Sequence, residues 1–422
     1  MDFRTVKKRF RKEVIHSIDG GRNSNFVIAR RFVALCLKIS GGVILTVFLA
    51  PISLFRPIEI WILRSRRPKI SLLIEDLEWG LRNLQMRRQG KKPIIIALYF
   101  LPFPNRQLAK MYRRILFLVG RKQIPLGKSL EFIIPIWGIT RKNPIERYQT
   151  MFEAWNIGKP SIFFSEHEAR LGTDLERRLF GGESPPFVCL AVQSHSYKKA
   201  IDVSATRYHG QLTDDPFTSI SPIANYLPVI RYLTGCGIAV VRVGMMEDEE
   251  LPPNLGSLVS DYAFDGRSEF GDVWLHSRCL FSLTGGAGSH WFAAAFNRPA
   301  VQADGYAIRS HYDERSLFIP QRAWVKDENR FLTFSEIRNS EFGRDKNLIQ
   351  NGVTIIKNTP EEIIDVTQEM ICRLAGTWIE TKQDQELQLK YRKVVDGFPV
   401  NHRTPARIGA KFLREHRYLL PD

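Results

Sequence analysis

Short, mainly apolar runs alternate with helix-like segments through the middle of the chain, and this alternation constrains the fold more than any other feature. The apolar runs lie at residues 187–192 (FVCLAV), 238–244, 280–285 and 300–306. Helical spacing fills much of the intervening sequence, at residues 223–237, 269–279 and 289–299. Mainly apolar strands that alternate regularly with helices predict a parallel sheet with helices on both faces, so the predicted fold class is α/β.

A second α/β series precedes this one. Its strand candidates are residues 94–100, 131–137 and 162–164, and its helix candidates are residues 72–88, 105–120, 144–156 and 171–180. A cluster of glycine, serine and proline at residues 181–186 predicts a domain boundary. We therefore expect two Rossmann-like domains, 71–184 and 185–375, that face a cleft with ligand sites at the carboxyl ends of strands. Residues 376–422, including a basic amphipathic helix at 405–420, are expected to pack back across both domains.

The first 70 residues form a basic tail followed by an apolar segment. Nine Lys or Arg and three acids occupy positions 1–31, and Lys38 is the only charge between residues 32 and 55. Twenty-four helical residues would cover ~36 Å, but Gly41, Gly42 and Pro51 weaken a straight helix. A shallow or re-entrant membrane anchor is favoured over a full span or a buried soluble helix. This predicts a membrane-associated protein on the cytoplasmic face of the inner membrane.

Composition narrows the possible partners. The chain has 61 Lys and Arg against 44 Asp and Glu, a formal net charge of +17, with ordinary globular apolar and charged fractions. Such a charge suits nucleic acid, an anionic membrane surface or a phosphorylated small molecule. Nucleic acid is not expected, because stacking aromatics do not interleave with a basic sheet face. Five well-separated cysteines predict neither a zinc site nor a disulfide framework.

The most informative segment is LFSLTGGAGSHWFAAAF, residues 280–296. An apolar strand ends in a glycine-rich turn, after which a helix begins; the turn comprises Gly285, Gly286, Ala287, Gly288, Ser289 and His290. Glycine lets backbone N–H groups approach a ligand, and the start of a helix favours an anion. The turn therefore predicts a diphosphate site. The alternative is a tight β–α turn without a ligand, in which Ser289 caps the helix.

Other polar residues follow the predicted strands. Arg242 would grip a phosphate, or instead pair with a neighbouring acid. Asp261 would hold a base or ribose, or instead stabilise a turn, and Asp304 is similar. Asp272 is predicted to lie on a helix and face the loops.

The sequence nominates a catalytic base only weakly. The long polar loop at 193–218 supplies His195 and His209, and FFSEHEAR supplies Glu166. Histidine accepts protons near neutral pH, although a structural role is the alternative for each of these residues. No firm metal-ligand spacing is present, so no metal is expected, and no cofactor is expected either. A Ser–His–Asp hydrolase is not supported, because no GxSxG motif is present.

Residues 160–340, and more loosely the helix at 405–420, resemble a bacterial glycosyltransferase family that accompanies surface-polysaccharide genes. The shared features run from FVCLAV through VVRVG and SDYAFDGRSEFGDVWLHSRCLFSL to the glycine turn. A more distant similarity is to heptosyltransferases and fucosyltransferases of GT-B architecture. The resemblance implies a GT-B-like fold with a donor site at Arg242, Gly244, Asp261, Tyr262 and residues 285–290.

The same resemblance implies an activity. A sugar would pass from a nucleotide-sugar donor to a glycan or lipid-linked acceptor, with helix dipoles and basic side chains rather than a metal neutralising the leaving diphosphate. Gln193-Ser194 stands where the family usually has an Arg-Asp pair. The alternative is therefore a catalytically inactive module that binds a nucleotide or polysaccharide at the membrane.

Overall fold

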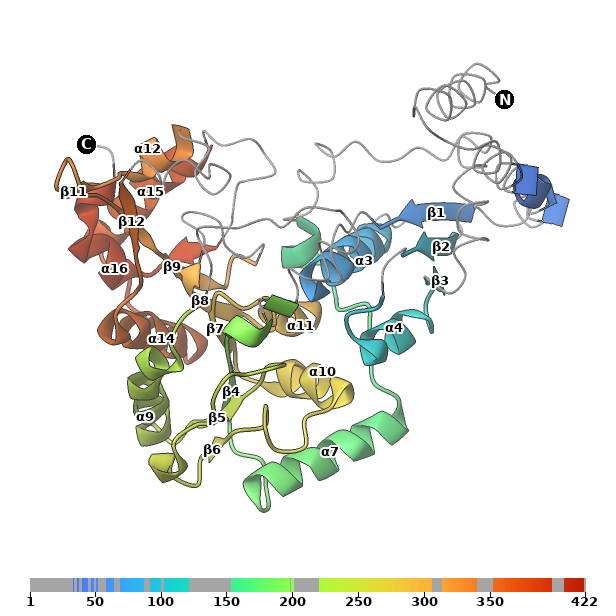
Figure 1. Cartoon of the computed structure of the whole chain (residues 1–422), viewed down its shortest axis with the longest axis horizontal. Coiled ribbons are helices and arrows are strands. Elements are labelled where there is room, and N and C mark those ends of the chain that lie inside the picture. The colour runs from blue at the N-terminus through green and yellow to red at the C-terminus, as the bar shows by residue number, and fades with distance from the viewer. Residues whose placement is uncertain are drawn as a thin grey trace, which may run out of the picture. The chain divides into compact units, whose positions relative to one another are not determined.

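The computed structural model describes most of the chain beyond residue 57 (Figure 1). It describes scattered residues between 33 and 51 and then residues 58–63, 69–86, 92–99, 102–120, 153–197, 199–200, 220–305, 313–339, 352–396 and 406–420. The predicted strand at 131–137, most of the predicted helix at 144–156, and His209 lie outside the described residues. The chain forms two compact units, residues 1–68 with 87–143 and residues 69–86 with 144–422.

The first unit contains a small parallel sheet with strand order β1-β2-β3. Its elements are β1 (Ile58–Ile62), β2 (Ile94–Leu98), α4 (Arg106–Tyr112) and β3 (Phe117–Val119). Helix α4 begins at Asn105, whose side-chain oxygen accepts a hydrogen bond from the N–H of Leu108 at 2.9 Å. The predicted helix over 105–120 is wrong in its second half. Phenylalanine and valine favour strands, and Phe117–Val119 pairs with β2.

The second unit is built on a seven-stranded sheet in which every neighbouring pair is parallel. The strand order is β13-β9-β8-β7-β4-β5-β6. The strands are β4 (Phe187–Val192), β5 (Ala239–Arg242), β6 (Val259–Ser260), β7 (Ser282–Gly285), β8 (Ala300–Gly305), β9 (Leu317–Pro320) and β13 (Arg407–Ile408). The predicted parallel α/β architecture is therefore confirmed for this unit.

The sheet order reverses once. From β4 the chain moves outward to β5 and β6, then returns to place β7 on the other side of β4 and continues to β8 and β9. This is the order of a dinucleotide-binding sheet. Val192 and Gly285 pair at the ends of β4 and β7. We call this place, between the carboxyl ends of β4 and β7, the reversal point.

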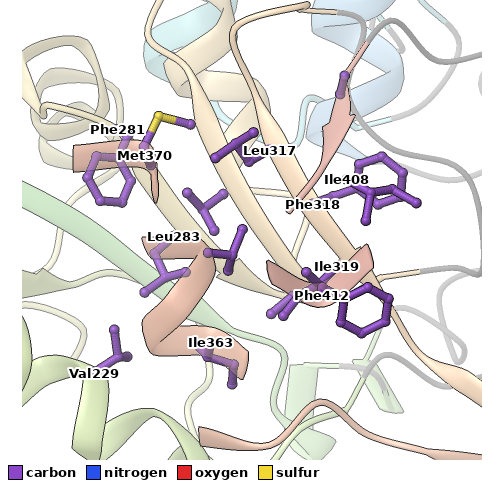
Figure 2. Packing of buried hydrophobic residues seen from close by; sticks show 14 of the residues in the cluster. Val229, Phe281, Leu283, Leu317, Phe318, Ile319, Ile363, Met370, Ile408 and Phe412 are labelled. Carbon is purple, nitrogen blue, oxygen red and sulfur yellow. The ribbon is translucent and has the colours of Figure 1, made fainter. Parts of the chain in front are cut away.

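Helices cover both faces of the seven-stranded sheet. The flanking helices are α7 (Glu166–Phe180), α9 (Leu227–Gly235), α10 (Glu269–Arg278), α11 (His290–Ala295), α14 (Pro360–Leu374) and α16 (Ala410–Glu415). Val188 and Leu190 of β4 share a buried cluster with α9, α14 and α16, whereas Phe187 and Cys189 share one with α7, α10 and α11. Alternate residues of a strand point to opposite faces, which explains why β4 is apolar throughout. Figure 2 shows members of the first cluster, among them Leu283 and Ile363.

The chain divides at other points than the expected boundary at 184. Helix α3 (Ile70–Met86) and α7 both belong to the second unit. α3 docks through Arg82, which donates to carbonyl oxygens of α11, and a Cβ on Gly172 of α7 would meet the Trp274 ring of α10 at 2.0 Å. The predicted strand at 162–164 is wrong, because these residues lead directly into Ser165, the N-cap of α7.

The remaining elements complete the second unit. A small antiparallel sheet consists of β11 (Arg330–Phe331), β10 (Arg322–Val325) and β12 (Val353–Ile356), and two helices, α12 (Phe334–Asn339) and α15 (Lys382–Asp396), pack together. The predicted helix at 405–420 is shorter than expected. Its first residues pair with β9 as β13, so α16 begins only at Ala410. In the described part of the chain, no helix combines the length and hydropathy needed to cross a membrane.

Candidate functional site

The sheet brings most of the predicted site residues to one edge. Parallel strands end together, so the carboxyl ends of β4 to β9 form a single edge of the sheet, which we call the carboxyl edge. The segments that leave this edge contain the predicted residues Arg242, Gly244, Asp261, Asp304 and residues 285–289. His195 also follows directly after β4. The sheet topology therefore brings these segments to the same edge, as expected.

The glycines of the turn have different roles. Gly286 has a φ of 66°, which favours glycine, and its N–H donates to the carbonyl oxygen of Ala303 at 3.3 Å. A Cβ on Gly285 would lie 2.3 Å from the Tyr226 hydroxyl oxygen. The fold itself therefore requires both of these glycines. Gly288 is exposed and a Cβ there would meet nothing within 4 Å, so it is the position at which a ligand can approach the backbone.

Ser289 and His290 complete the turn. Ser289 makes no capping hydrogen bond, and its hydroxyl oxygen is buried without a hydrogen-bond partner among the described residues. The alternative of Ser289 as a side-chain cap is therefore wrong. His290 is buried, with Nδ1 at 3.0 Å from the carbonyl oxygen of Ala287. At this turn the Ser289 hydroxyl is therefore a buried polar group that no described residue contacts.

Arg242 adopts the alternative role that the sequence left open. Its side chain is 2% exposed, and its two terminal nitrogens contact Glu247 at 3.0 Å and Asp261 at 3.3 Å. Nη1 also donates to the carbonyl oxygen of Glu249 at 2.6 Å. Because a buried guanidinium already paired with two carboxylates has little left to offer a phosphate, the predicted phosphate contact is not supported.

Three further donor-site candidates have structural roles. Asp261 accepts the N–H of Leu251 at 2.7 Å as well as the contact from Arg242, as expected for a turn aspartate. Tyr262 is fully buried, and its hydroxyl accepts the N–H of Ser268 at 2.8 Å. A Cβ on Gly244 would collide with the Glu247 carboxylate at 2.0 Å. In this structure these residues contact other parts of the chain at the carboxyl edge, and their assignment as donor contacts stays a prediction.

The segment after β5 carries an acid with an unusual pKa. Burial raises the pKa of Glu247 to about 7, against the opposing effect of Arg242. The two residues before Glu247, Met245 and Met246, are exposed, and Met246 has a φ of 62°. A buried carboxyl group with a raised pKa therefore lies beside the carboxyl edge.

A carboxylate of the chain itself occupies the helix start that follows β4. Ser194 donates to the carbonyl oxygen of Met246 at 2.8 Å, which ties this start to the segment after β5. Asp248 accepts the N–H groups of His195 at 2.7 Å and Ser196 at 3.0 Å. Desolvation opposes ionisation of Asp248, but the hydrogen bonds from Ser196 and His195 outweigh it and lower its pKa. On the β4 side of the reversal point, an anion therefore already neutralises the helix start.

Asp304 anchors the other side of the reversal point. It is fully buried with a φ of 52°. Its carboxylate accepts the Ser221 hydroxyl at 2.5 Å, the Tyr226 hydroxyl at 3.2 Å and the N–H of Asn358 at 2.8 Å. Burial, together with Asp304, raises the pKa of Tyr226 well above its usual value. Asp304 therefore fixes the tyrosine that covers Gly285.

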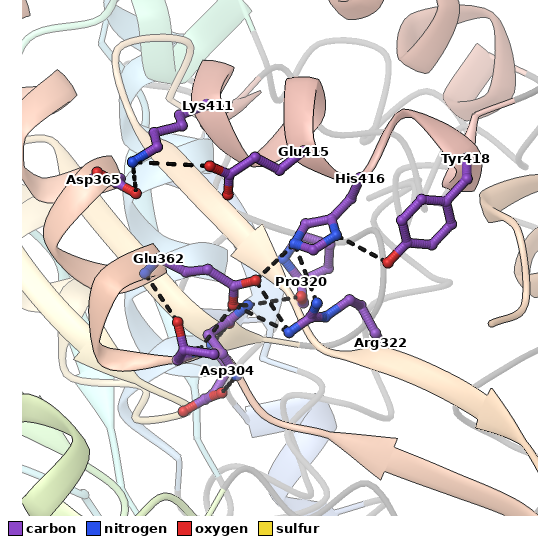
Figure 3. Close-up of polar contacts among 11 residues, drawn as sticks. Asp304, Pro320, Arg322, Glu362, Asp365, Lys411, Glu415, His416 and Tyr418 are labelled. Atoms are coloured by element: carbon purple, nitrogen blue, oxygen red, sulfur yellow. Dashed lines mark hydrogen bonds and ion pairs between the residues drawn. The ribbon is translucent and has the colours of Figure 1, made fainter. Parts of the chain in front are cut away.

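This network continues into a buried polar cluster, shown in Figure 3. Glu362 of α14 accepts from Asn358 at 3.2 Å, pairs with Arg322 at 3.1 Å and lies 2.7 Å from Nε2 of His416. The sequence pattern did not reveal this cluster, because its members come from β10, α14 and the end of α16 and share no local motif. It holds the C-terminal elements against the end of β8.

The remaining predicted residues are placed as follows. Asp272 lies on α10, 2.5 Å from Arg267 in the loop before that helix, and burial raises its pKa to about 6. Glu166 is the first residue of α7, an exposed position. His195 is exposed beside the reversal point. Within the described ranges, no group of three His, Cys, Asp or Glu side chains is placed to hold a metal.

Comparison with known proteins gives two solved structures with similarity to this chain. One is the E. coli ADP-heptose LPS heptosyltransferase II, with a TM-score of 0.43, 14% identity, and coverage of 75% of this chain and 99% of that chain. The other is a glycosyl transferase family 9 protein from Veillonella parvula, with a TM-score of 0.32, 14% identity, and coverage of 79% and 94%. No protein-family model and no curated protein matches the chain.

Proposed function

We propose that this chain is a glycosyltransferase that binds a nucleotide-sugar donor at the carboxyl edge of its seven-stranded sheet and transfers the sugar to a glycan or lipid-linked acceptor in cell-surface polysaccharide synthesis. The observation that carries the proposal is the reversal of strand order between β4 and β7, with the glycine turn leaving the sheet at that point. Ligands of open parallel sheets bind outside such a reversal. The sequence resemblance supports the choice of chemistry.

The donor diphosphate is assigned to the β7 side of the reversal point. On the β4 side, Asp248 already neutralises the helix start. On the β7 side, a Cβ on Gly288 would meet no atom within 4 Å, and the buried Ser289 hydroxyl has no partner in the part of the chain that the structure describes. Oxygen atoms of a diphosphate accept hydrogen bonds from such groups.

A cation other than Arg242 is needed beside this diphosphate. Lys357 follows β12 and adjoins Asn358, whose N–H contacts Asp304. Burial lowers the pKa of Lys357, and the attraction of Asp304 opposes that change. Its neighbour Asn358 contacts Asp304 at the end of β8, and we propose Lys357 as a phosphate-binding residue that the sequence pattern did not identify.

The transfer requires three events at the anomeric carbon. An acceptor hydroxyl oxygen forms a bond to this carbon, the bond from the carbon to the diphosphate breaks, and the nucleoside diphosphate leaves with the electron pair. A base takes the proton of the hydroxyl. Of the two nominated bases that the structure describes, we propose His195, because it is exposed beside the reversal point and a neutral imidazole accepts a proton near neutral pH.

The donor site is tested by adding a negative charge to it. Gly288→Asp places a carboxylate where a Cβ meets no atom within 4 Å, and Gly182→Asp does the same at an exposed position on the far end of α7. A carboxylate a few ångströms from a diphosphate costs more than ~1.4 kcal/mol at an effective dielectric constant near 20, so donor affinity should fall at least about tenfold. Calorimetric titration with a panel of nucleotide sugars measures this. Equal affinities for the two variants would refute the site.

A nucleotide-binding module without turnover is the second candidate, favoured by Gln193-Ser194 in place of the family's Arg-Asp pair. Release of nucleoside diphosphate by the wild-type chain, with acceptor lipid extract present, separates the two. His195→Gln should abolish this release and leave donor affinity unchanged. Donor binding without release by the wild type would establish the module instead.

A further inference from the structure

Three contacts fix the backbone where the glycine turn leaves β7. The N–H of Gln193, directly after β4, donates to the carbonyl oxygen of Gly285 at 3.0 Å. The N–H of Gly286 donates to the carbonyl oxygen of Ala303 in β8 at 3.3 Å. A Cβ on Gly285 would lie 2.3 Å from the hydroxyl oxygen of Tyr226, the residue before α9. The turn is therefore held from β4, from β8 and from the segment that leads into α9.

All three contacts lead to the side chain of Asp304. The Tyr226 hydroxyl donates to Oδ2 of Asp304 at 3.2 Å. Gln193 forms a parallel bridge with Ile220, and the next residue, Ser221, donates its hydroxyl to the same Oδ2 at 2.5 Å. The contact from β8 needs no intermediary, because the residue that accepts from the turn directly precedes Asp304. One carboxylate thus connects the three elements that hold the turn.

Asp304 is itself held in one conformation. It is fully buried, and its φ of 52° is one that a residue other than glycine seldom adopts. Its N–H donates to Oδ1 of Asn358 at 2.7 Å, and its own Oδ1 accepts the N–H of Asn358 at 2.8 Å. Its carbonyl oxygen accepts from Nε2 of Gln321 at 2.8 Å. Residues held in such a conformation concentrate where the backbone shape serves a site.

The two hydroxyl contacts are the arms through which Asp304 can act on the turn. A carboxylate accepts a hydrogen bond more strongly than a neutral oxygen does, so both hydroxyl groups are firmly oriented. The Tyr226 arm places an aromatic ring against Gly285, and the Ser221 arm places the bridge partner of Gln193. Because Asp304 is fully buried, its effect on a ligand passes through these two arms.

We propose that Asp304 is a positioning residue for the donor site, which keeps the turn at residues 285–289 in the conformation that binds a diphosphate. This inference rests on the proposed function. When a binding conformation is only partly populated, the apparent affinity for the ligand falls by the populated fraction. Loss of either hydroxyl should therefore weaken donor binding, although neither hydroxyl is assigned a contact with the donor.

The test removes one hydroxyl at a time from the full chain. Tyr226→Phe keeps the ring over Gly285, and Ser221→Ala removes a single oxygen atom. Ser165→Ala is the matched control, because it removes a serine hydroxyl that accepts the N–H of Glu168 at 3.3 Å at the start of α7. Calorimetric titration with a panel of nucleotide sugars, below the melting temperature of every variant, measures donor affinity. Amide hydrogen exchange of the peptide over residues 282–292 measures how often the turn opens.

We expect Tyr226→Phe and Ser221→Ala to bind the donor about tenfold more weakly than wild type, the scale of one hydrogen bond to a charged group. Exchange of the turn peptide should be faster in both. Ser165→Ala should lower the melting temperature and leave donor affinity and the turn peptide unchanged.

The possible outcomes separate this inference from the proposed function. A wild type that binds donor while Tyr226→Phe and Ser221→Ala bind it equally well would overturn the positioning role and leave the proposed function intact. An equal loss of affinity in the Ser165→Ala control would also overturn it, because the effect would then follow general stability. A wild type that binds no nucleotide sugar would overturn the proposed function, and this inference with it.

Discussion

Removal of the Arg82 guanidinium should release α3 from the second unit. The side chain is fully buried and contacts Glu78 through Nε at 2.8 Å. Its terminal nitrogens donate to Asn297 at 2.6 Å and to four carbonyl oxygens, those of Trp155, Gly158, Ala294 and Ala295. The last two carbonyls end α11, where the helix dipole is negative. Arg82→Met keeps the aliphatic volume and removes every one of these contacts.

The expected loss of stability depends on the buried groups that Arg82→Met leaves in place. Glu78 is fully buried and keeps a hydrogen bond from the Ser161 N–H, but it loses its ion pair. Breaking a buried ion pair by removing one partner costs ~3–5 kcal/mol. The cation–π contact with Trp155, 4.3 Å from the Arg82 carbon to the ring centre, is lost as well. Arg82→Met with Glu78→Gln should recover part of the loss, because no buried charge is then left.

Amide hydrogen exchange of peptides from α3 measures this directly. A loss of ~3–5 kcal/mol in the free energy of local opening predicts exchange faster by roughly a hundredfold or more. Arg177→Met is the control, because the Arg177–Asp174 pair on α7 has side chains 63% and 60% exposed. Exposed pairs contribute about 0–1 kcal/mol. If both variants changed exchange equally, the buried network would not hold α3 in place.

Two other substitutions probe stability. Since burial raises the pKa of Glu247 to about 7 from 4.5, the folded chain holds a proton that the unfolded chain releases, so stability falls as pH rises from about 4.5 to 7. Glu247→Gln should remove this slope, which for one group is at most ~1.4 kcal/mol per pH unit; parallel urea-midpoint profiles of the variant and the wild type from pH 4.5 to 8 would contradict this. Gly172→Ala should destabilise the folded chain by ~1–3 kcal/mol, because the added Cβ would clash with Trp274. Gly235→Ala is the control, because a Cβ there meets no atom within 4 Å. Equal melting temperatures of the two variants would count against the packing argument.

The parallel sheet was predictable because its signal is local. The central strands of the seven-stranded sheet are buried on both faces, so strands such as β4 and β7 are recognisable as mainly apolar runs bounded by breakers. The first unit was harder. Phe117–Val119 follows a helix without a glycine or proline between them, so helical spacing appeared to continue through it. Nothing in the local pattern of Arg407–Ile408 marks it as a strand, because its partner β9 lies far away in the sequence.

The candidate site was predictable in position but not in detail. The glycine turn follows a buried strand, and the sheet order then determines where it lies. The roles of Arg242 and Tyr262 depend on acids and backbone groups brought in by other loops, which no spacing reveals. The role of Ser289 was not predictable either. A serine directly before a helix usually caps it with its hydroxyl, but the Ser289 hydroxyl makes no capping hydrogen bond.

The pairing of β13 with β9 has a consequence for how the chain is made. Arg407 lies beside Leu317, 90 positions earlier, so β9 leaves the ribosome long before its outer partner exists. During that interval its row of backbone donors and acceptors is open to any extended segment nearby. Nascent chains that stop shortly before position 406 should therefore depend most on chaperones. Once synthesis is complete, β13 pairs with the open edge of β9 and this dependence ends.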